Sequence, residues 1–176
     1  MPIVQTELEN PVTGLRLREQ SDPGAGASAE LVWEASYAPR TPEPPPHLHP
    51  RQDEHMRIVA GRLFARVAGE VRTLVPGEVL EIPAGTPHSV WTEAEPATTI
   101  WRTMPALRTR EFTRKLYDLA REGRTDARGV PGLLQVAVLA TAYRDVIGFP
   151  RPPAPVQRVV FGILAPIGRL LGRRAT

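Results

Sequence analysis

The sequence predicts a mainly β domain of the sandwich or barrel type, followed by an α-helical extension. Between residues 31 and 104, apolar and polar residues alternate in short pieces, and glycines at 61, 69, 77 and 85 mark turns at eight-residue intervals. After Pro105 the apolar residues take up a helical spacing instead. A chain of 176 residues that is 41% hydrophobic suits one compact core with appendages.

Five segments of the first part are predicted to hold the strands. They are LVWEASYAP (31–39), MRIVAGRLFARVAG (56–69), EVRTLVPGEVLEIPAG (70–85), HSVWTE (88–93) and TTIWRTM (98–104). We expect residues 1–104 to form the β domain. Its strands carry five large aromatic residues, which we expect in the core or a dimer interface rather than at a substrate: Trp33, Tyr37, Phe64, Trp91 and Trp101.

Two helices are predicted in residues 105–149, an extension expected to pack on the barrel or on a partner subunit. Phe112, Leu116, Leu119 and Ala120 share one helical face, with Thr109 as a candidate N-cap and Gly123 beyond the end. Pro131 then opens the almost wholly apolar stretch GLLQVAVLATAYRDVI, which Gly148 is expected to stop.

The last segment follows a Pro-rich linker at 150–155 and is predicted to be a basic amphipathic helix over 156–176, broken or kinked at Pro166. Arginines flank its apolar residues, and it has no acidic residue. We expect the stripe to cover the protein's own core or a second subunit; the alternative is docking on anionic lipid or another protein. The stripe is Val156, Val159, Val160, Ile163, Leu164, Ile167, Leu170 and Leu171.

Charge and composition exclude several kinds of protein. The chain has no cysteine, so disulfides, thiolate metal sites and cysteine nucleophiles are absent. Residues 1–104 carry a net charge of −5 and residues 105–176 a net charge of +8, but no helix-turn-helix or aromatic-basic pattern accompanies the basic part, so we expect no nucleic acid partner. The N-terminus lacks the apolar region of a signal peptide, and we expect a cytoplasmic protein.

Three of the four histidines lie in PPPHLHPRQDEH, residues 44–55. In an extended strand His47 and His49 project from the same face, so both imidazoles can reach one ion. A carboxylate follows, either Asp53 or Glu54, and His88 comes after a Pro-x-Gly turn that can fold it back toward this pair. Imidazoles with a carboxylate are ligands for divalent Fe, Mn, Ni, Cu or Zn.

These residues resemble the cupins, whose two motifs are G(x)5HxH(x)3-4E(x)6G and G(x)5PxG(x)2H(x)3N. The first is matched by HLHPRQDEHMRIVAG and the second by GEVLEIPAGTPHSVWT. The motif core spans residues 41–92, and it departs from the pattern where Thr41 replaces the first glycine and Thr92 the final asparagine. The resemblance implies a double-stranded β-helix, or jelly-roll, barrel holding one divalent transition metal on His47, His49, Glu54 and His88.

The resemblance, to single-domain metal-binding cupins of the quercetinase type, implies a dioxygenase-like enzyme acting on a small apolar or phenolic molecule. In that reading Glu54 is also the catalytic base that takes a proton from the substrate. Alternation from Glu54 and His88 predicts an apolar cavity lined by Met56, Ile58, Val90 and Thr92. His55 is expected on the opposite face of the strand, in a structural or solvent-facing role.

Two other functions remain open on the sequence. One is a redox-neutral cupin cyclase or isomerase, since ligand types do not select between an oxygen-activating and a redox-silent metal. The other is a non-catalytic cupin that binds a small ligand. Because a cupin barrel has exposed sheet edges and this chain has apolar helices to cover, we expect a homodimer, with weak membrane-surface contact by the last helix as a further partner.

Overall fold

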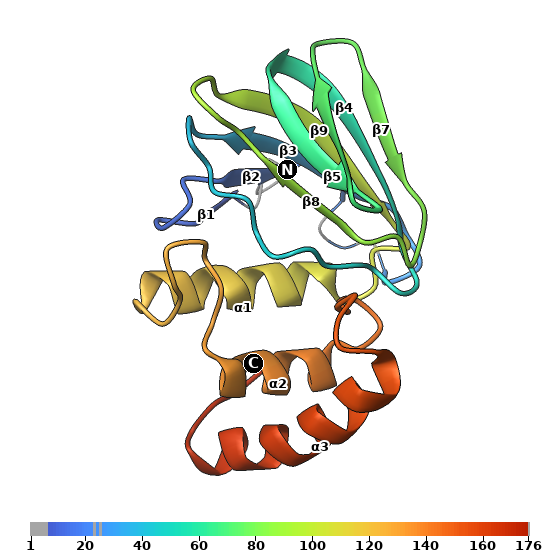
Figure 1. Cartoon of the computed structure of the whole chain (residues 1–176). Coiled ribbons are helices and arrows are strands. Elements are labelled where there is room, and N and C mark those ends of the chain that lie inside the picture. The colour runs from blue at the N-terminus through green and yellow to red at the C-terminus, as the bar shows by residue number, and fades with distance from the viewer. Residues whose placement is uncertain (1–6, 23, 25, 176) are drawn as a thin grey trace.

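The computed structural model describes residues 7–22, 24 and 26–175. Within them, nine strands are followed by three helices. The strands form the upper part of the molecule and the helices are stacked below them, with α3 outermost (Figure 1). Residues 1–6 of the predicted β domain and Thr176 of the predicted last helix lie outside the described residues.

Two antiparallel sheets make up the β domain. The larger has the order β1-β2-β3-β9-β4-β7, and its strands are Glu7–Glu9, Arg16–Glu19, Leu31–Tyr37, Ala97–Met104, Asp53–Gly61 and Val79–Ile82. The smaller has the order β6-β5-β8, with strands Glu70–Leu74, Leu63–Val67 and His88–Trp91. The five predicted strand segments are confirmed, and two of them each contain two strands.

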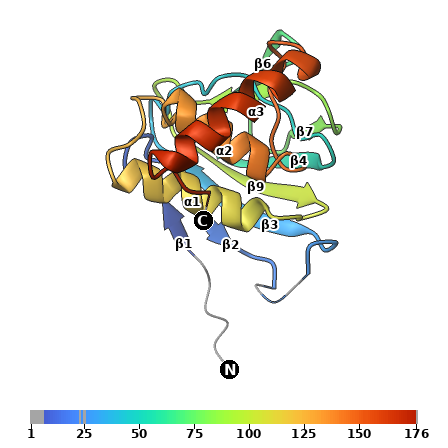
Figure 2. The ribbon, with the colours of Figure 1, turned by 90° about the horizontal axis from the view of Figure 1, so that it is seen from below.

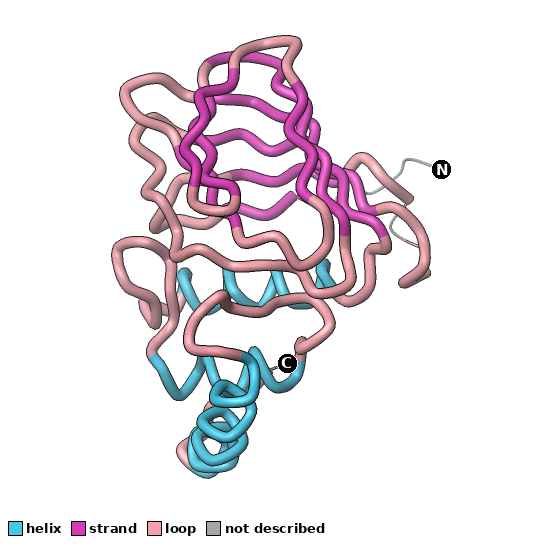
Figure 3. Tube along the Cα trace, turned by 45° about the vertical axis from the view of Figure 1, so that its right-hand side comes forward, coloured by secondary structure: helices cyan, strands magenta, loops and turns pink. Residues whose placement is uncertain are grey.

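The two sheets face each other (Figure 3), and the core lies between them. In β3 every second residue is buried, and in β4 burial alternates as far as Ile58. The inner residues include Leu31, Trp33, Ala35, Met56, Ile58, Leu63, Ala65, Leu80 and Ile82. This arrangement confirms the predicted fold class, a mainly β jelly roll with an α-helical extension.

Glycines set the turns where the sequence predicted them. Gly61, Gly69, Gly77 and Gly85 all have positive φ angles, between 74° and 94°. At Gly61 a Cβ atom would lie 1.8 Å from the carbonyl oxygen of Pro96, so no other residue fits. The sequence did not predict β1 and β2, which have three and four residues and lie before the alternating segments.

Helix α1, Thr109–Arg121, matches the first predicted helix, and Gly123 follows its end with φ of 67°. The proposed N-cap is wrong: Arg108 occupies that position and Thr109 is already helical. The Thr109 hydroxyl instead accepts a 2.8 Å hydrogen bond from Nε2 of the buried Gln52. A tertiary contact to the β domain has replaced the local cap.

Helix α2, Leu133–Ala142, is shorter than the predicted stretch, which was to run on to Gly148. The chain leaves the helix at Tyr143 because the next residues pair with the β domain. Leu48 and Gly148 exchange two backbone hydrogen bonds of 2.9 and 2.8 Å. The segment 143–149 thus lies against the loop that carries His47 and His49.

Helix α3, Ala154–Leu170, begins inside the predicted linker, since Pro153 is its N-cap and Pro155 fits its first turn. It continues through Pro166 without a break. It packs on α2 through Ala165 and Gly168, both buried (Figure 2). No helix in the described part of the chain has the length and apolar character required to cross a membrane.

The apolar stripe of α3 does not cover the protein's own core, which was one of the two expectations; cover by a second subunit stays a prediction. Seven of its eight members are exposed, and only Leu164 is partly buried. The side of α3 that faces α2 consists instead of the buried Ala165 and Gly168, with Phe161 and Leu164 partly buried beside them. Periodicity correctly found the apolar face of this helix but could not show which way it points.

Candidate metal centre

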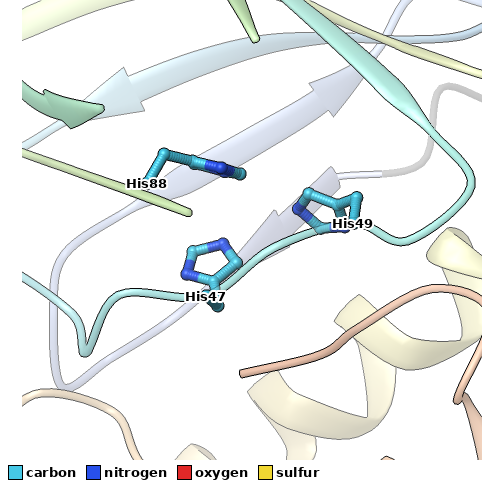
Figure 4. Close-up of side chains that lie close together, drawn as sticks. All are labelled: His47, His49 and His88. Atoms are coloured by element: carbon cyan, nitrogen blue, oxygen red, sulfur yellow. The ribbon is translucent and has the colours of Figure 1, made fainter. Parts of the chain in front are cut away.

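Three histidines meet at the end of the β domain that faces the helices. His88 is the first residue of β8, and it exchanges two backbone hydrogen bonds of 3.0 and 2.8 Å with His47. His49 lies two residues further along the same loop as His47. The three rings point toward one another (Figure 4), with centroids 4.6 to 5.3 Å apart. One ligand atom from each lies within 4.8 Å of the others, so the cluster could hold a metal ion.

Backbone carbonyl groups fix the orientation of all three rings. The Nδ1 atoms of His47, His49 and His88 lie 3.3, 2.6 and 3.0 Å from the carbonyl oxygens of Pro45, Val146 and Thr86. A carbonyl oxygen only accepts, so each Nδ1 carries the proton and each Nε2 presents a lone pair. This is the tautomer that a metal-binding imidazole requires.

The Glu54 carboxylate lies beside two of these lone pairs. Its Oε1 is 3.2 Å from Nε2 of His49, and its Oε2 is 3.0 Å from Nε2 of His88. Trp101 Nε1 donates a 3.0 Å hydrogen bond to Oε1. With Nδ1 protonated, each Nε2 and the carboxylate are both acceptors, so a proton or a cation must lie between them. The donor set therefore fits a divalent metal.

The electrostatics of the cluster favour cation binding. Burial by itself would raise the pKa of Glu54, but the neighbouring histidines together lower it to about 2, so the carboxylate is ionised. Burial is the main cause that lowers the pKa of His47 to about 3, and the other two histidines add to it. At His88 burial acts in the same direction, but the hydrogen bond and charge of Glu54 outweigh it and raise the pKa.

The two candidate carboxylates point in opposite directions. Asp53 is exposed, and its Oδ1 accepts a 2.8 Å hydrogen bond from the backbone NH of Ala84, in the turn before His88. Glu54 is 2% exposed and lies with the histidines. His55 is half-buried on the opposite face of β4 and does not join the cluster. Of the two acidic residues, only Glu54 is placed to share an ion with them.

The two departures from the cupin motifs lie side by side. The Thr41 backbone NH donates to the Thr92 hydroxyl at 3.0 Å, and that hydroxyl donates to the carbonyl oxygen of Ala38. The Thr41 hydroxyl also donates to the Ala38 carbonyl. The pair therefore anchors the segment that leads to His47. Thr92, expected in the cavity, is held in this network instead.

A cavity of about 250 Å³ lies beside the cluster, between the β domain and the helices. Met56 and Val90 line it as predicted, whereas Ile58 belongs to the core between the sheets. Apart from the histidines and Glu54, its only charged lining residue within the described chain is Arg128. The extension supplies much of the apolar wall: Phe112, Leu116, Val136, Leu139, Ala140, Ile147 and Phe149.

Sequence reasoning missed several participants. Tyr37 and Trp101 belong to the core as expected for the strand aromatics but also line the cavity, and Tyr117 of α1 lines it with them. Trp101 pairs with Met56 across β9 and β4 and so lies next to Glu54, but the sequence alone does not give this register. No sequence signal identifies the Val146 carbonyl that orients His49, since every residue carries a carbonyl group.

Comparison with known proteins agrees with this geometry. A family model described as a cupin domain matches residues 33–102. A comparison with curated proteins gave no significant match.

Similar solved structures include KdgF from a Halomonas species, with 22% identity over 57% of this chain and 86% of that one and a TM-score of 0.47. The nucleoside dehydratase Pac13 of Streptomyces shares 12% identity over 60% of this chain and 80% of its own, with a TM-score of 0.49. A structure of DMSP lyases shares 21% identity over 51% of this chain, with a TM-score of 0.45, and the match covers only 47% of its length. Residues 33–102 therefore match a cupin domain in sequence, and the two facing sheets and the histidine cluster agree with that match.

Proposed function

We propose that the protein is a metal-dependent enzyme acting on a small apolar or phenolic molecule, with dioxygenase-like chemistry. One observation carries the proposal: three metal-competent Nε2 atoms and an ionised carboxylate lie together at an apolar cavity. His47, His49, His88 and Glu54 would hold the ion. A bound Fe, Mn, Ni or Cu ion would supply redox chemistry with O2. Any of these ions, or Zn, would polarise an oxygen atom of the substrate.

Glu54 is the proposed proton acceptor for a substrate hydroxyl. Its low pKa keeps it ionised at neutral pH, and Trp101 holds one of its oxygens in place. The surrounding apolar side chains exclude water and offer no cluster of basic groups for a phosphate. A cavity of about 250 Å³ is slightly below the range of about 300–1,000 Å³ usual for ligand pockets, which suits a small molecule.

A second candidate, a redox-neutral isomerase, cyclase or lyase, is favoured by Tyr37. Its side chain lines the cavity, and burial together with the nearby Glu54 charge raises the pKa of its phenol. The hydroxyl therefore keeps its proton at neutral pH and can donate a hydrogen bond to substrate. A proton acceptor and a neutral hydrogen-bond donor in one cavity suit a redox-neutral proton transfer.

Elemental analysis of the untagged protein tests the shared basis of both candidates. We expect near one equivalent of a transition metal in the wild type and none in a His49→Ala, His88→Ala double variant. A folded wild type free of metal, which also takes up none of the five ions on addition, would contradict the proposal and favour a non-catalytic ligand-binding cupin.

Oxygen uptake with phenolic substrates then separates the two candidates. Uptake that depends on the metal, and that Glu54→Gln abolishes while part of the metal is retained, supports the dioxygenase. Turnover that proceeds without oxygen and is lost in Tyr37→Phe supports the redox-neutral enzyme. Unchanged turnover in Glu54→Gln would remove Glu54 from either mechanism.

A further inference from the structure

We propose that the outward face of α3 docks on an anionic lipid surface. This outward face consists of seven exposed apolar residues: Val156, Val159, Val160, Ile163, Ile167, Leu170 and Leu171. The proposal does not depend on the metal centre, because no residue of α3 lines the cavity beside the metal centre.

The packing of α3 on α2 fixes the direction of the outward face. A Cβ atom at Gly168 would lie 2.9 Å from Val138 Cγ2 and 3.0 Å from the carbonyl oxygen of Leu134, so the two helices are in close contact there. At about 100° per residue, Val159 and Leu170 lie on the opposite side of α3 from Gly168. α3 is also the helix furthest from the β domain (Figure 1). The outward face thus points away from the rest of the described protein.

The exposure of this face is larger than isolated surface residues would explain. Val159, Ile163 and Leu170 are 64%, 60% and 87% exposed, and they lie one and then two turns apart along one side of α3. Contiguous apolar surface on a soluble domain marks a contact with another molecule. A helix that lies along its domain and shows one apolar side has the form of an interfacial membrane helix.

Charge identifies the occupant. Residues 146–176 contain five arginines and no acidic residue. Arg158 and Arg169 are exposed and lie on one flank of α3, three turns apart, and Arg173 and Arg174 follow its end. Pairing residues 146–176 with the same segment of a second copy would bring ten arginines together with no acidic residue from either segment. An anionic lipid surface instead neutralises them, and each basic residue near such a surface strengthens binding.

Vesicle flotation tests this docking. We expect the wild type to float with vesicles of equal parts phosphatidylcholine and phosphatidylglycerol at low salt, and to float less with pure phosphatidylcholine or at high salt. An Ile163→Ser, Leu170→Ser variant should lose binding, whereas the matched exposed change Val71→Ser on β6 should keep it. Equal binding by wild type and double variant, or no wild-type binding, overturns the proposal.

The arginines are tested separately. Arg158→Gln and Arg169→Gln should each weaken partitioning about fivefold. The exposed Arg57 and Arg62 of the β domain are the matched controls, and changing them to Gln should have no such effect. Sedimentation without lipid tests the rival occupant, a second copy of the chain. If the wild type is a dimer and the Ile163→Ser, Leu170→Ser variant is a monomer, the outward face of α3 binds a second copy and lipid docking is overturned.

Discussion

Strand β4 and helix α3 use amphipathic patterns in opposite ways. In β4 the inward positions hold Met56, Ile58 and the site residue Glu54, and outward positions such as Asp53 and Arg57 meet water. In α3 the inward positions hold Ala165 and Gly168, and the large apolar residues face outward. The contrast shows that a sequence pattern sorts residues onto faces, whereas tertiary contacts decide which face is buried.

This difference predicts that changes at the histidine cluster have large effects on the fold, and changes on α3 small ones. The largest effect is expected from metal removal. If the metal is present at about 1,000 times its Kd, it stabilises the fold by about 4 kcal/mol. For a chain of this size that corresponds to a fall in Tm of about 10 °C on chelation.

Calorimetry with and without chelator measures this fall, and the His88→Ala variant should show none. Hydrogen exchange should locate the effect. Protection gained on metal binding is expected in 45–55, 83–92 and 143–149, because the last segment orients His49 through the Val146 carbonyl. Equal protection gained in α3 would contradict the prediction that metal binding stabilises the histidine cluster and leaves α3 unaffected.

Acid should destabilise the metal-free protein through the same cluster. The pKa of His47 is about 3 in the folded state against 6.5 for a free side chain, so the unfolded state binds more protons between these values. The sign is the same for Glu54, whose pKa falls from 4.5 to about 2. The stability that His47 and Glu54 contribute is therefore fully present above pH 6.5 and is lost as the pH falls, with the contribution of His47 lost first. The raised pKa of His88 acts in the opposite sense, stabilising the fold at low pH.

We expect Tm to drop by at least about 5 °C between pH 7 and pH 4.5, equivalent to about 2 kcal/mol. In His47→Gln, which cannot titrate, the drop should be clearly smaller. Thermal melts of the chelated wild type and of chelated His47→Gln at both pH values measure the two drops. An identical drop in the two proteins would place the acid sensitivity elsewhere.

Gln52 should be the next most sensitive position. It is 1% exposed, and its Nε2 lies within 3.2 Å of the Pro105 and Ala106 carbonyls and the Thr109 hydroxyl. Gln52→Ala leaves these acceptors without a donor and should cost about 2 kcal/mol in urea unfolding. Gln157→Ala is the control, since Gln157 also bonds two carbonyls but lies half-buried at the start of α3. Equal losses of unfolding free energy in the two variants would contradict the prediction that Gln52 is the more sensitive position.

The fold and the histidine cluster followed from local signals in the sequence. Alternation found the strand segments, glycines that need positive φ found the turns, and motif spacing brought His88 to His47 and His49. Each of these signals depends on a few neighbouring residues. The resemblance to cupins added the topology that joins the two motifs.

What the sequence could not provide depends on contacts between distant segments. Helix α2 ends early because Gly148 pairs with Leu48, and Thr109 is not a cap because Gln52 reaches it. The cavity wall contributed by Phe112, Leu139 and their neighbours also arises only when the extension folds over the β domain. No periodicity along the chain records such long-range pairings.

The smallest effects, and the sharpest test of how α3 sits, come from its two interior glycines. An alanine in a helix is favoured over glycine by about 1 kcal/mol. At Gly162 a Cβ atom would meet nothing within 4 Å, so Gly162→Ala should gain up to about 1 kcal/mol. At Gly168 the Cβ atom would press on Val138 and the Leu134 carbonyl, so the propensity gain should be cancelled and a net loss of about 1 kcal/mol should remain. Urea unfolding of the two variants gives the comparison directly. Stabilisation by both alanines would mean that α3 does not sit tightly on α2 and that its outward face is not fixed in direction.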